Sequence, residues 1–331
     1  MRKTFLIVIA FLFAFATEQM QAQFRIISYN VENLFDTEHD SLNLDYDFLP
    51  DGKYRWSRNR YQRKIENISR VIANINGWGT AAVVGLCEVE NSRCLNDLLQ
   101  AGGLKKYGYK YLHKESPDQR GIDCALLYDP KQFHLLDSSF IAVPLPADER
   151  PTRDIVYVCG EVRLNKTEKA TSRQKQQRDT LHVLMCHLPS QTGGTAETAH
   201  KRAIAHRVLQ STIDSIYHKQ PFAKIVIMGD MNAAPTDHLK GMHNLMIPME
   251  KHGEGTHKWQ GVWSCLDQFF VSHSLAERAK AHIFNEYWLL EEDRQYGGDE
   301  PLRSYKYLTW QPSGCSDHLP IYLDLLPAPK R

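Results

Sequence analysis

The feature of this sequence that most restricts its fold is a series of short apolar segments, most of them rich in β-branched or aromatic residues. Segments of this length and composition, bounded by polar or turn residues, predict β-strands rather than helices. They cover residues 24–29, 81–87, 123–128, 155–162, 180–186, 224–228, 268–271 and 321–325. Helical segments alternate with them, so the chain is predicted to belong to the α/β class.

Two of the intervening segments have the spacing of amphipathic helices. In the first, apolar residues recur every three or four positions from Tyr61 to Ile75, and Asn76-Gly77 then predicts the helix end. The second covers about residues 196–217. Residues 166–178 are polar and rich in charge, which predicts a long solvated loop between two strands. Because no segment has the composition of a linker or a repeat, we expect one domain over residues 23–331.

The first 22 residues have the organisation of a secretory signal peptide. Arg2 and Lys3 precede an apolar run over residues 5–15, and a polar, small-residue segment follows it as far as Ala22. The run is too short to span a hydrocarbon core ~30 Å thick, which needs roughly 20 residues. We therefore expect residues 1–22 to be removed and the protein to be exported, either to the periplasm or out of the cell. An uncleaved anchor or a buried N-terminal element is the alternative. No later apolar run predicts a transmembrane segment.

The charge balance limits the classes of partner. The 331 residues include 40 Lys+Arg and 39 Asp+Glu, and removal of residues 1–22 would leave no net charge. This balance argues against a strongly basic protein that coats nucleic acid, although a local basic groove stays open. The seven cysteines are odd in number and contain no CxxC pair, so neither a zinc knuckle nor a redox dithiol is indicated. We expect the domain to be a monomer.

Polar residues that can carry chemistry stand where the predicted strands begin or end. They are Asn30, Glu88, His187, Asp230, Asn232, Asp267, Asp317 and His318. Each one alone has an ordinary explanation as a turn, a helix cap or a solvated loop residue. A common position at strand ends can bring them together at one rim of a sheet, where rigid strands hold functional loops.

Six motifs together resemble the endonuclease/exonuclease/phosphatase superfamily, which includes deoxyribonuclease-I-like nucleases, abasic-site endonucleases, neutral sphingomyelinases and inositol polyphosphate 5-phosphatases. The motifs are Ser28-Tyr-Asn-Val31, Gly85-Leu-Cys-Glu-Val89, Cys186-His-Leu-Pro189, Met228-Gly-Asp-Met-Asn232, Leu266-Asp-Gln-Phe-Phe-Val-Ser272 and Ser316-Asp-His-Leu-Pro320. Two further stretches, residues 30–36 and 187–194, resemble an exported bacterial branch of the superfamily. The resemblance implies a four-layer α/β sandwich, in which two mixed β-sheets are flanked by helices.

A divalent cation is implied by the same resemblance. Phosphate-ester hydrolysis needs charge neutralisation on the phosphoryl oxygens, and oxygen ligands suit Mg²⁺, or alternatively Mn²⁺, better than zinc. Glu88 is the first candidate ligand, and the resemblance implies that Asn30 and Asp317 complete or support the site.

The remaining motif residues are candidate catalytic groups. Asp230 would orient or deprotonate the attacking water, and Asn232 would hold the phosphate or the nucleophile. His318, oriented by Asp267, would contact the phosphate as a cation, because a carboxylate favours the charged imidazole. His187 would contact the phosphate or assist the leaving oxygen. Which of these groups moves protons stays open.

Arginines supply candidate contacts to the substrate. Arg120 stands in a loop that enters a predicted strand, where the resemblance implies a basic residue, so it is a candidate phosphate clamp, with a solvated loop arginine as the alternative. Arg153 and Arg202 are weaker candidates. The sequence therefore predicts a magnesium-dependent phosphodiesterase or phosphatase, and the alternatives are a secreted nuclease and a non-catalytic binding protein that retains the fold.

Three substrate classes stay open: nucleic acid, phospholipid headgroups and small phosphate esters. A nuclease would use a basic, aromatic groove, for which residues 54–61 and 303–307 are candidates. A phospholipid hydrolase would use an exposed apolar loop, and residues 287–290 are the candidate. We expect residues 287–290 to be a buried anchor instead.

Overall fold

A computed structural model describes residues 24–77, 79–162, 164, 179–191 and 194–326. The predicted signal peptide and the predicted loop at residues 166–178 lie outside the described residues. Within them, no helix is both long enough and apolar enough to cross a membrane. All seven cysteines lie in the described part of the chain, where each is buried and has a free thiol.

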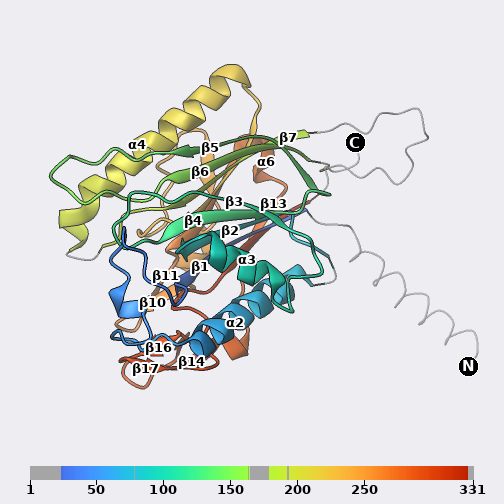
Figure 1. Ribbon diagram of the computed structural model, residues 1–331. Coiled ribbons are helices and arrows are strands. Elements are labelled where there is room, and N and C mark those ends of the chain that lie inside the picture. Colours follow the sequence, from blue (N-terminus) through green and yellow to red (C-terminus); the bar gives the residue numbers. More distant parts are fainter. Residues whose placement is uncertain (1–23, 78, 163, 165–178, 192–193, 327–331) are drawn as a thin grey trace, which may run out of the picture.

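Two six-stranded β-sheets form the centre of the molecule (Figure 1). The first sheet has the order β13 (Ala279–Ile283), β18 (Ile321–Leu325), β1 (Phe24–Leu34), β2 (Val83–Val89), β4 (Asp123–Tyr128) and β3 (Lys110–His113). The second has the order β5 (Phe133–Ile141), β6 (Ile155–Val162), β7 (Asp179–His187), β8 (Lys224–Asp230), β12 (Asp267–Ser272) and β9 (Met242–Asn244). Strands β1 and β2 are parallel, as are β7 and β8, whereas the other pairs are antiparallel. Both sheets are therefore mixed, as the resemblance implied.

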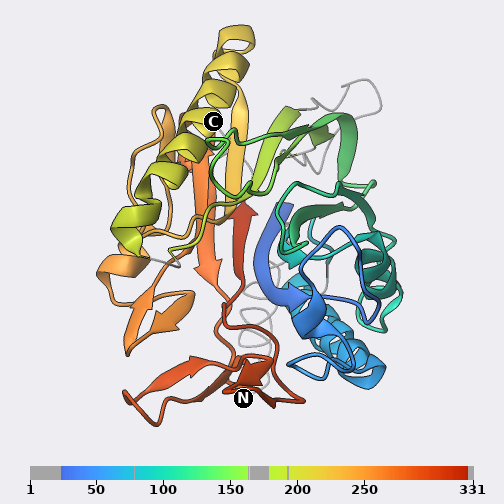
Figure 2. The same ribbon diagram turned by 60° about the vertical axis from the view of Figure 1, so that its left-hand side comes forward.

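Helices cover the outer face of each sheet, which gives four layers (Figures 1 and 2). Helices α2 (Arg58–Asn76) and α3 (Ser92–Gln100) pack on the first sheet, and α4 (Thr195–Lys219) packs on the second. Successive residues of a strand point to opposite faces, so Ile26 joins the core between the sheets while Ile27 joins the core under α2 and α3. Burial on both faces explains why the central strands read as continuous apolar runs.

The predicted four-layer sandwich is confirmed, and each predicted strand corresponds to an observed one. Helices α2 and α4 lie where helical spacing placed them, and α2 ends at Gly77, whose φ is +58°. None of the four edge strands, β3, β5, β9 and β13, was predicted. Each has partly or fully exposed side chains, so its sequence lacks the continuous apolar run of a central strand.

Small elements gather at one end of the sandwich (Figure 2). Three of them are two-stranded hairpins: β10 (His257–Trp259) with β11 (Val262–Ser264), β14 (Leu290–Glu292) with β15 (Asp299–Pro301), and β16 (Tyr305–Lys306) with β17 (Thr309–Trp310). The others are the short helices η1 (Tyr46–Phe48), α5 (Ile247–Lys251) and η2 (Tyr287–Leu289). Helix α6 (His273–Ala276) lies at the opposite end, where Ser274 donates to the carbonyl of Ala223, the residue before β8. Residue His257 of β10 bridges to His318, which connects the β10–β11 hairpin to the predicted site.

Candidate active site

The predicted site residues meet at one rim of the two sheets. Asn30 and Glu88 lie toward the carboxyl ends of the parallel strands β1 and β2, and His187 and Asp230 end the parallel strands β7 and β8. Asp267 begins β12 and pairs in register with Asp230. Parallel strands end at the same edge, so residues far apart in the sequence become neighbours there.

A local irregularity in the first sheet directs Glu88. The pairing of β2 with β4 shifts register between Cys87 and Val89, and Glu88 itself has φ of +66°. One carboxylate oxygen of Glu88 accepts the backbone N–H of Asn33 at 2.8 Å, and the other lies 3.3 Å from the side-chain amide nitrogen of Asn30. The Glu88 side chain is 15 % exposed, so it stays accessible to a ligand at the rim.

Asn30 joins the two sheets at this point. Its side-chain nitrogen also donates to Asp230 Oδ2 at 3.1 Å, and its side-chain oxygen accepts from the backbone of Glu32 at 3.0 Å. The nitrogen of Asn30 therefore faces both carboxylates. A cation beside Glu88 would meet the Asn30 oxygen only if this amide turned over.

Asp230 is held by a turn that requires glycine. Gly229 has φ of +134°, and a Cβ atom there would lie 1.8 Å from the carbonyl oxygen of Cys186. Asp230 Oδ1 accepts the backbone N–H of Asn232 at 2.8 Å, and the Asn232 side chain donates to the Leu188 carbonyl at 3.0 Å. Burial, opposed by the charge of His318, raises the pKa of Asp230 to about 7. Asn232 thus positions the carboxylate of Asp230 and is itself tied to the β7 loop.

Two histidines face Asp230 in opposite charge states. His318 Nε2 lies 3.9 Å from Asp230 Oδ2, and His187 Nε2 lies 3.4 Å from the same oxygen. Burial lowers the pKa of His318, but the Asp267 carboxylate, 2.7 Å from Nδ1, outweighs it and the pKa is raised well above its usual value. Burial, together with the charges of Arg153 and Arg120, holds the pKa of His187 well below its usual value. Near neutral pH the site contains one cationic and one neutral imidazole.

The three candidate arginines lie at different depths in the structure. Arg153 is buried, with Nη2 3.4 Å from His187 Nε2 and Nε 3.1 Å from Asp118 Oδ2. Arg120, ranked first from the sequence, is half-exposed and lies 3.5 Å from the same Asp118 oxygen. Asp118 was not predicted, and its only sequence signal is its place in the loop of Arg120. Arg202 instead donates to the carbonyls of Pro189 and Thr195 and so braces the loop that follows His187.

Asp317 lies on the His318 side of the site. His257, Asp317 and His318 each have one possible metal-ligand atom, and these three atoms lie within 4.8 Å of one another. Burial raises the pKa of Asp317, yet the charges of His318, His257 and Arg303 outweigh it and the net pKa is lowered. His257 was not predicted, and burial, followed by the charge of His318, lowers its pKa to about 4. Of the three predicted metal ligands, Asn30 and Glu88 are hydrogen-bonded to each other, whereas Asp317 is grouped with the histidines.

The donor set fits a hard divalent cation. The carboxylates of Glu88 and Asp230 share one amide nitrogen, and Glu88 is the more accessible of the two. A cation beside Glu88 would offset the mutual repulsion of these carboxylates and favour the ionised form of Asp230.

The chain belongs to the endonuclease/exonuclease/phosphatase family, whose model matches residues 25–326. Among solved structures, the fold is similar to truncated TDP2 from Caenorhabditis elegans, with a TM-score of 0.57 and 17% identity over 92% of this chain and 98% of that one. It is also similar to a mannosyl-6-phosphatase from Bacteroides thetaiotaomicron, with a TM-score of 0.52 and 14% identity over 91% and 99% of the two chains. The human Nocturnin catalytic domain gives a TM-score of 0.51 and 16% identity over 91% and 93%. No curated protein matches the chain. At these identities the structures show a shared fold.

Proposed function

We propose that this protein is a metal-dependent hydrolase of phosphate esters, either a phosphodiesterase or a phosphatase, in which water attacks phosphorus in line with the leaving oxygen. The observation that carries the proposal is geometric: the imidazoles of His187 and His318 lie 3.4 and 3.9 Å from one oxygen of Asp230, next to the accessible carboxylate of Glu88. Burial lowers the pKa of His187, whereas at His318 burial is outweighed by the Asp267 carboxylate, which raises the pKa. Two histidines whose pKa values are shifted in opposite directions can have different roles, one in proton transfer and the other in stabilising negative charge.

Glu88 would hold the cation, with Asn30 and Asp317 in support, and Mg²⁺ or Mn²⁺ suits these oxygen donors. When bound, the cation would neutralise charge on the phosphoryl oxygens. Asp230 would orient the attacking water, and Asn232 keeps its carboxylate in place. Cationic His318 and buried Arg153 would bind phosphoryl oxygens, while neutral His187 can accept or pass a proton.

The geometry favours small substrates over the two macromolecular classes. Tyr54, Trp56, Arg303, Ser304, Tyr305 and Tyr307 of the two segments predicted for a nuclease groove line one pocket of about 300 Å³, whereas the exposed Arg55 and Arg58 lie outside its lining. In the segment proposed for membrane docking, Leu289 is buried and Trp288 packs under Arg70, whose guanidinium carbon lies 4.6 Å from the ring centre. Only Tyr287 of residues 287–289 is largely exposed, at 84 %. A secreted nuclease stays the alternative substrate proposal.

Export is part of the proposal and rests on residues 1–22 of the sequence. A mature protein in the periplasm or culture medium that begins near residue 23 would support it. A full-length protein retained with its first residues intact would contradict it.

Hydrolysis of p-nitrophenyl phosphate and bis-p-nitrophenyl phosphate tests the proposal. Activity should disappear in EDTA and return with Mg²⁺ or Mn²⁺. Glu88→Gln should reduce kcat/KM by about 10²-fold or more, because it removes the charged metal ligand. Glu66→Gln, an exposed change on α2, is the matched control. Activity that survives EDTA or Glu88→Gln would refute metal dependence, and a fold that turns over no phosphate ester would support the non-catalytic binding protein.

A further inference from the structure

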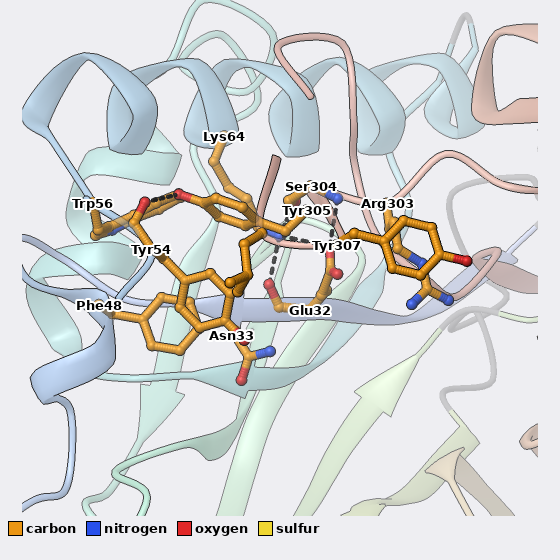
Figure 3. A pocket seen from close by; sticks show the side chains of 11 residues that line it. Glu32, Asn33, Phe48, Tyr54, Trp56, Lys64, Arg303, Ser304, Tyr305 and Tyr307 are labelled. Carbon is orange, nitrogen blue, oxygen red and sulfur yellow. Dashed lines mark hydrogen bonds and ion pairs between the residues drawn. The ribbon is translucent and has the colours of Figure 1, made fainter. Parts of the chain in front are cut away.

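A pocket of about 300 Å³ lies beside the active site, and five of its eleven lining residues are aromatic (Figure 3). Phe48 and Tyr54 stack with ring centres 4.8 Å apart, and Tyr54 lies 4.8 Å from Tyr305. The hydroxyl of Tyr305 donates to the backbone oxygen of Tyr54 at 2.8 Å, which joins segments about 250 residues apart in the sequence. The volume is at the small end of known ligand sites and suits a single ring better than a polymer.

The rim of this pocket is formed by a strained hairpin. Strands β16 and β17 pair Lys306 with Thr309, so Tyr307 and Leu308 form a two-residue turn, with φ of +49° and +66°. Such turns favour Asn-Gly, because a left-handed conformation costs about 1–2 kcal/mol for each ordinary residue. The β10–β11 hairpin has Gly261 at the second position of its own two-residue turn. The β16–β17 turn therefore keeps two unfavourable residues, and Tyr307 is 84 % exposed at the pocket.

Two polar side chains that line the pocket, those of Asn33 and Arg303, make no side-chain hydrogen bond within the described residues. By contrast, the buried Lys64 and the partly buried Glu32 at the pocket floor contact each other and Ser304. An amide and a guanidinium with open hydrogen-bonding positions beside aromatic rings provide donors and an acceptor for a hydroxylated ligand.

The pocket shares its boundary with the active site. Asn33 lines the pocket with its side chain and donates its backbone N–H to Glu88 at 2.8 Å. Arg303 also lines the pocket, and its charge acts on Asp317 and His257. A ligand in the pocket can therefore extend a phosphate toward Glu88, Asp230 and His318.

We propose that the pocket binds the ring of a sugar phosphate, with Tyr307 covering the ring and Asn33 and Arg303 binding its hydroxyls. This proposal rests on the proposed phosphate-ester hydrolase activity. It specifies which alcohol is esterified to the phosphate of the substrate, namely a sugar. Backbone strain persists at a ligand site when the side chain of the strained residue contributes to binding. Here it places an aromatic face over the pocket at a position where Asn-Gly would be more stable.

The test compares kcat/KM for glucose 6-phosphate with kcat/KM for glycerol 3-phosphate, which has no ring, in the presence of Mg²⁺. The wild-type protein should prefer the ringed ester. Tyr307→Ala should reduce that preference about three- to tenfold, which corresponds to the loss of one ring contact. Tyr307→Phe should keep the preference, and Tyr287→Ala, equally exposed but outside the pocket, should leave it unchanged.

A double variant separates this role from a structural one. Tyr307→Asn with Leu308→Gly should raise Tm by about 2–4 °C, because it relieves the strained turn, and should still lose the preference. An unchanged preference in both hairpin variants would overturn the proposal while the hydrolase stands. A stronger preference for sphingomyelin vesicles would also overturn it.

Failure of the proposed hydrolase activity has a different signature. If neither ester is hydrolysed, calorimetric binding of glucose 6-phosphate to Glu88→Gln decides the matter. Binding that Tyr307→Ala weakens would support the pocket alone, and absence of binding would overturn it.

Discussion

Replacement of Asp267 by Asn should weaken both catalysis and stability, in a way that depends on pH. Asp267 is fully buried, His318 is 8 % exposed, and their atoms approach to 2.7 Å. Loss of one partner of a buried pair costs about 3–5 kcal/mol. Because the Asn side-chain oxygen can still accept a hydrogen bond from Nδ1, we expect a loss of about 2–3 kcal/mol in the free energy of unfolding.

The pH dependence follows from the raised pKa of His318. A histidine whose folded-state pKa lies above the ordinary value of about 6.5 contributes its full stability below that value and loses it as pH rises through the folded-state pKa. The difference between wild type and Asp267→Asn should therefore be largest near about pH 6 and shrink toward alkaline pH. Neutral His318 would also bind phosphate less well, so kcat/KM at neutral pH should fall by about 10²–10⁴-fold.

Urea unfolding at several pH values, together with pH–rate profiles, measures both effects. Asp214→Asn is the control, because Asp214 is an exposed carboxylate on α4, the helix that covers the outer face of the second sheet. A stability difference that is independent of pH, or that grows with pH, would show that His318 does not owe its charge to Asp267. Unchanged kcat/KM would remove His318 from the proposed phosphate site.

Two further predictions concern buried geometry. Gly229→Ala should destabilise the protein by about 3 kcal/mol or more and disturb Asp230, because the added Cβ meets the Cys186 carbonyl; Gly102→Ala, with open space around it, is the control in thermal unfolding. Lys64→Met should leave Glu32 buried without its cation. Burial, opposed by Lys64, raises the pKa of Glu32 to about 7, so this group lowers stability as pH rises from about 4.5 toward 7. The variant should therefore lose more Tm at about pH 8 than at about pH 5, and an equal loss at both would contradict the assignment.

Local sequence was sufficient to predict the central strands and most of the polar residues that meet at the rim of the two sheets. The strands at residues 123–128, 155–162 and 321–325 coincide with β4, β6 and β18, because strands buried on both faces need continuous apolar residues. The edge strands β3 and β5 could not be predicted in this way, since solvent takes the place of a partner on one side.

The arginines show where local reasoning stops. Arg120 stands in a loop that enters a predicted strand, whereas Arg153 is the guanidinium in contact with His187 and Arg202 donates to backbone carbonyls. The position of an arginine in the sequence does not tell how deeply the residue is buried or where its side chain points. His257 and Asp118 reach the site through a hairpin bridge and a shared ion pair that have no local signal.

By itself the sequence determined which residues could carry chemistry and that they stand at strand ends, because apolar runs and the polar residues that interrupt them are local properties. Only the tertiary structure decided the charge states, since these depend on burial and on neighbours from other strands: His318 is cationic beside Asp267, and His187 is neutral beside Arg153. It also brought Tyr54 and Trp56 together with Arg303, Ser304, Tyr305 and Tyr307 around one pocket. Those residues are basic and aromatic in any conformation, but the packing of the β16–β17 hairpin against the loop before α2 encloses a space suited to one ring.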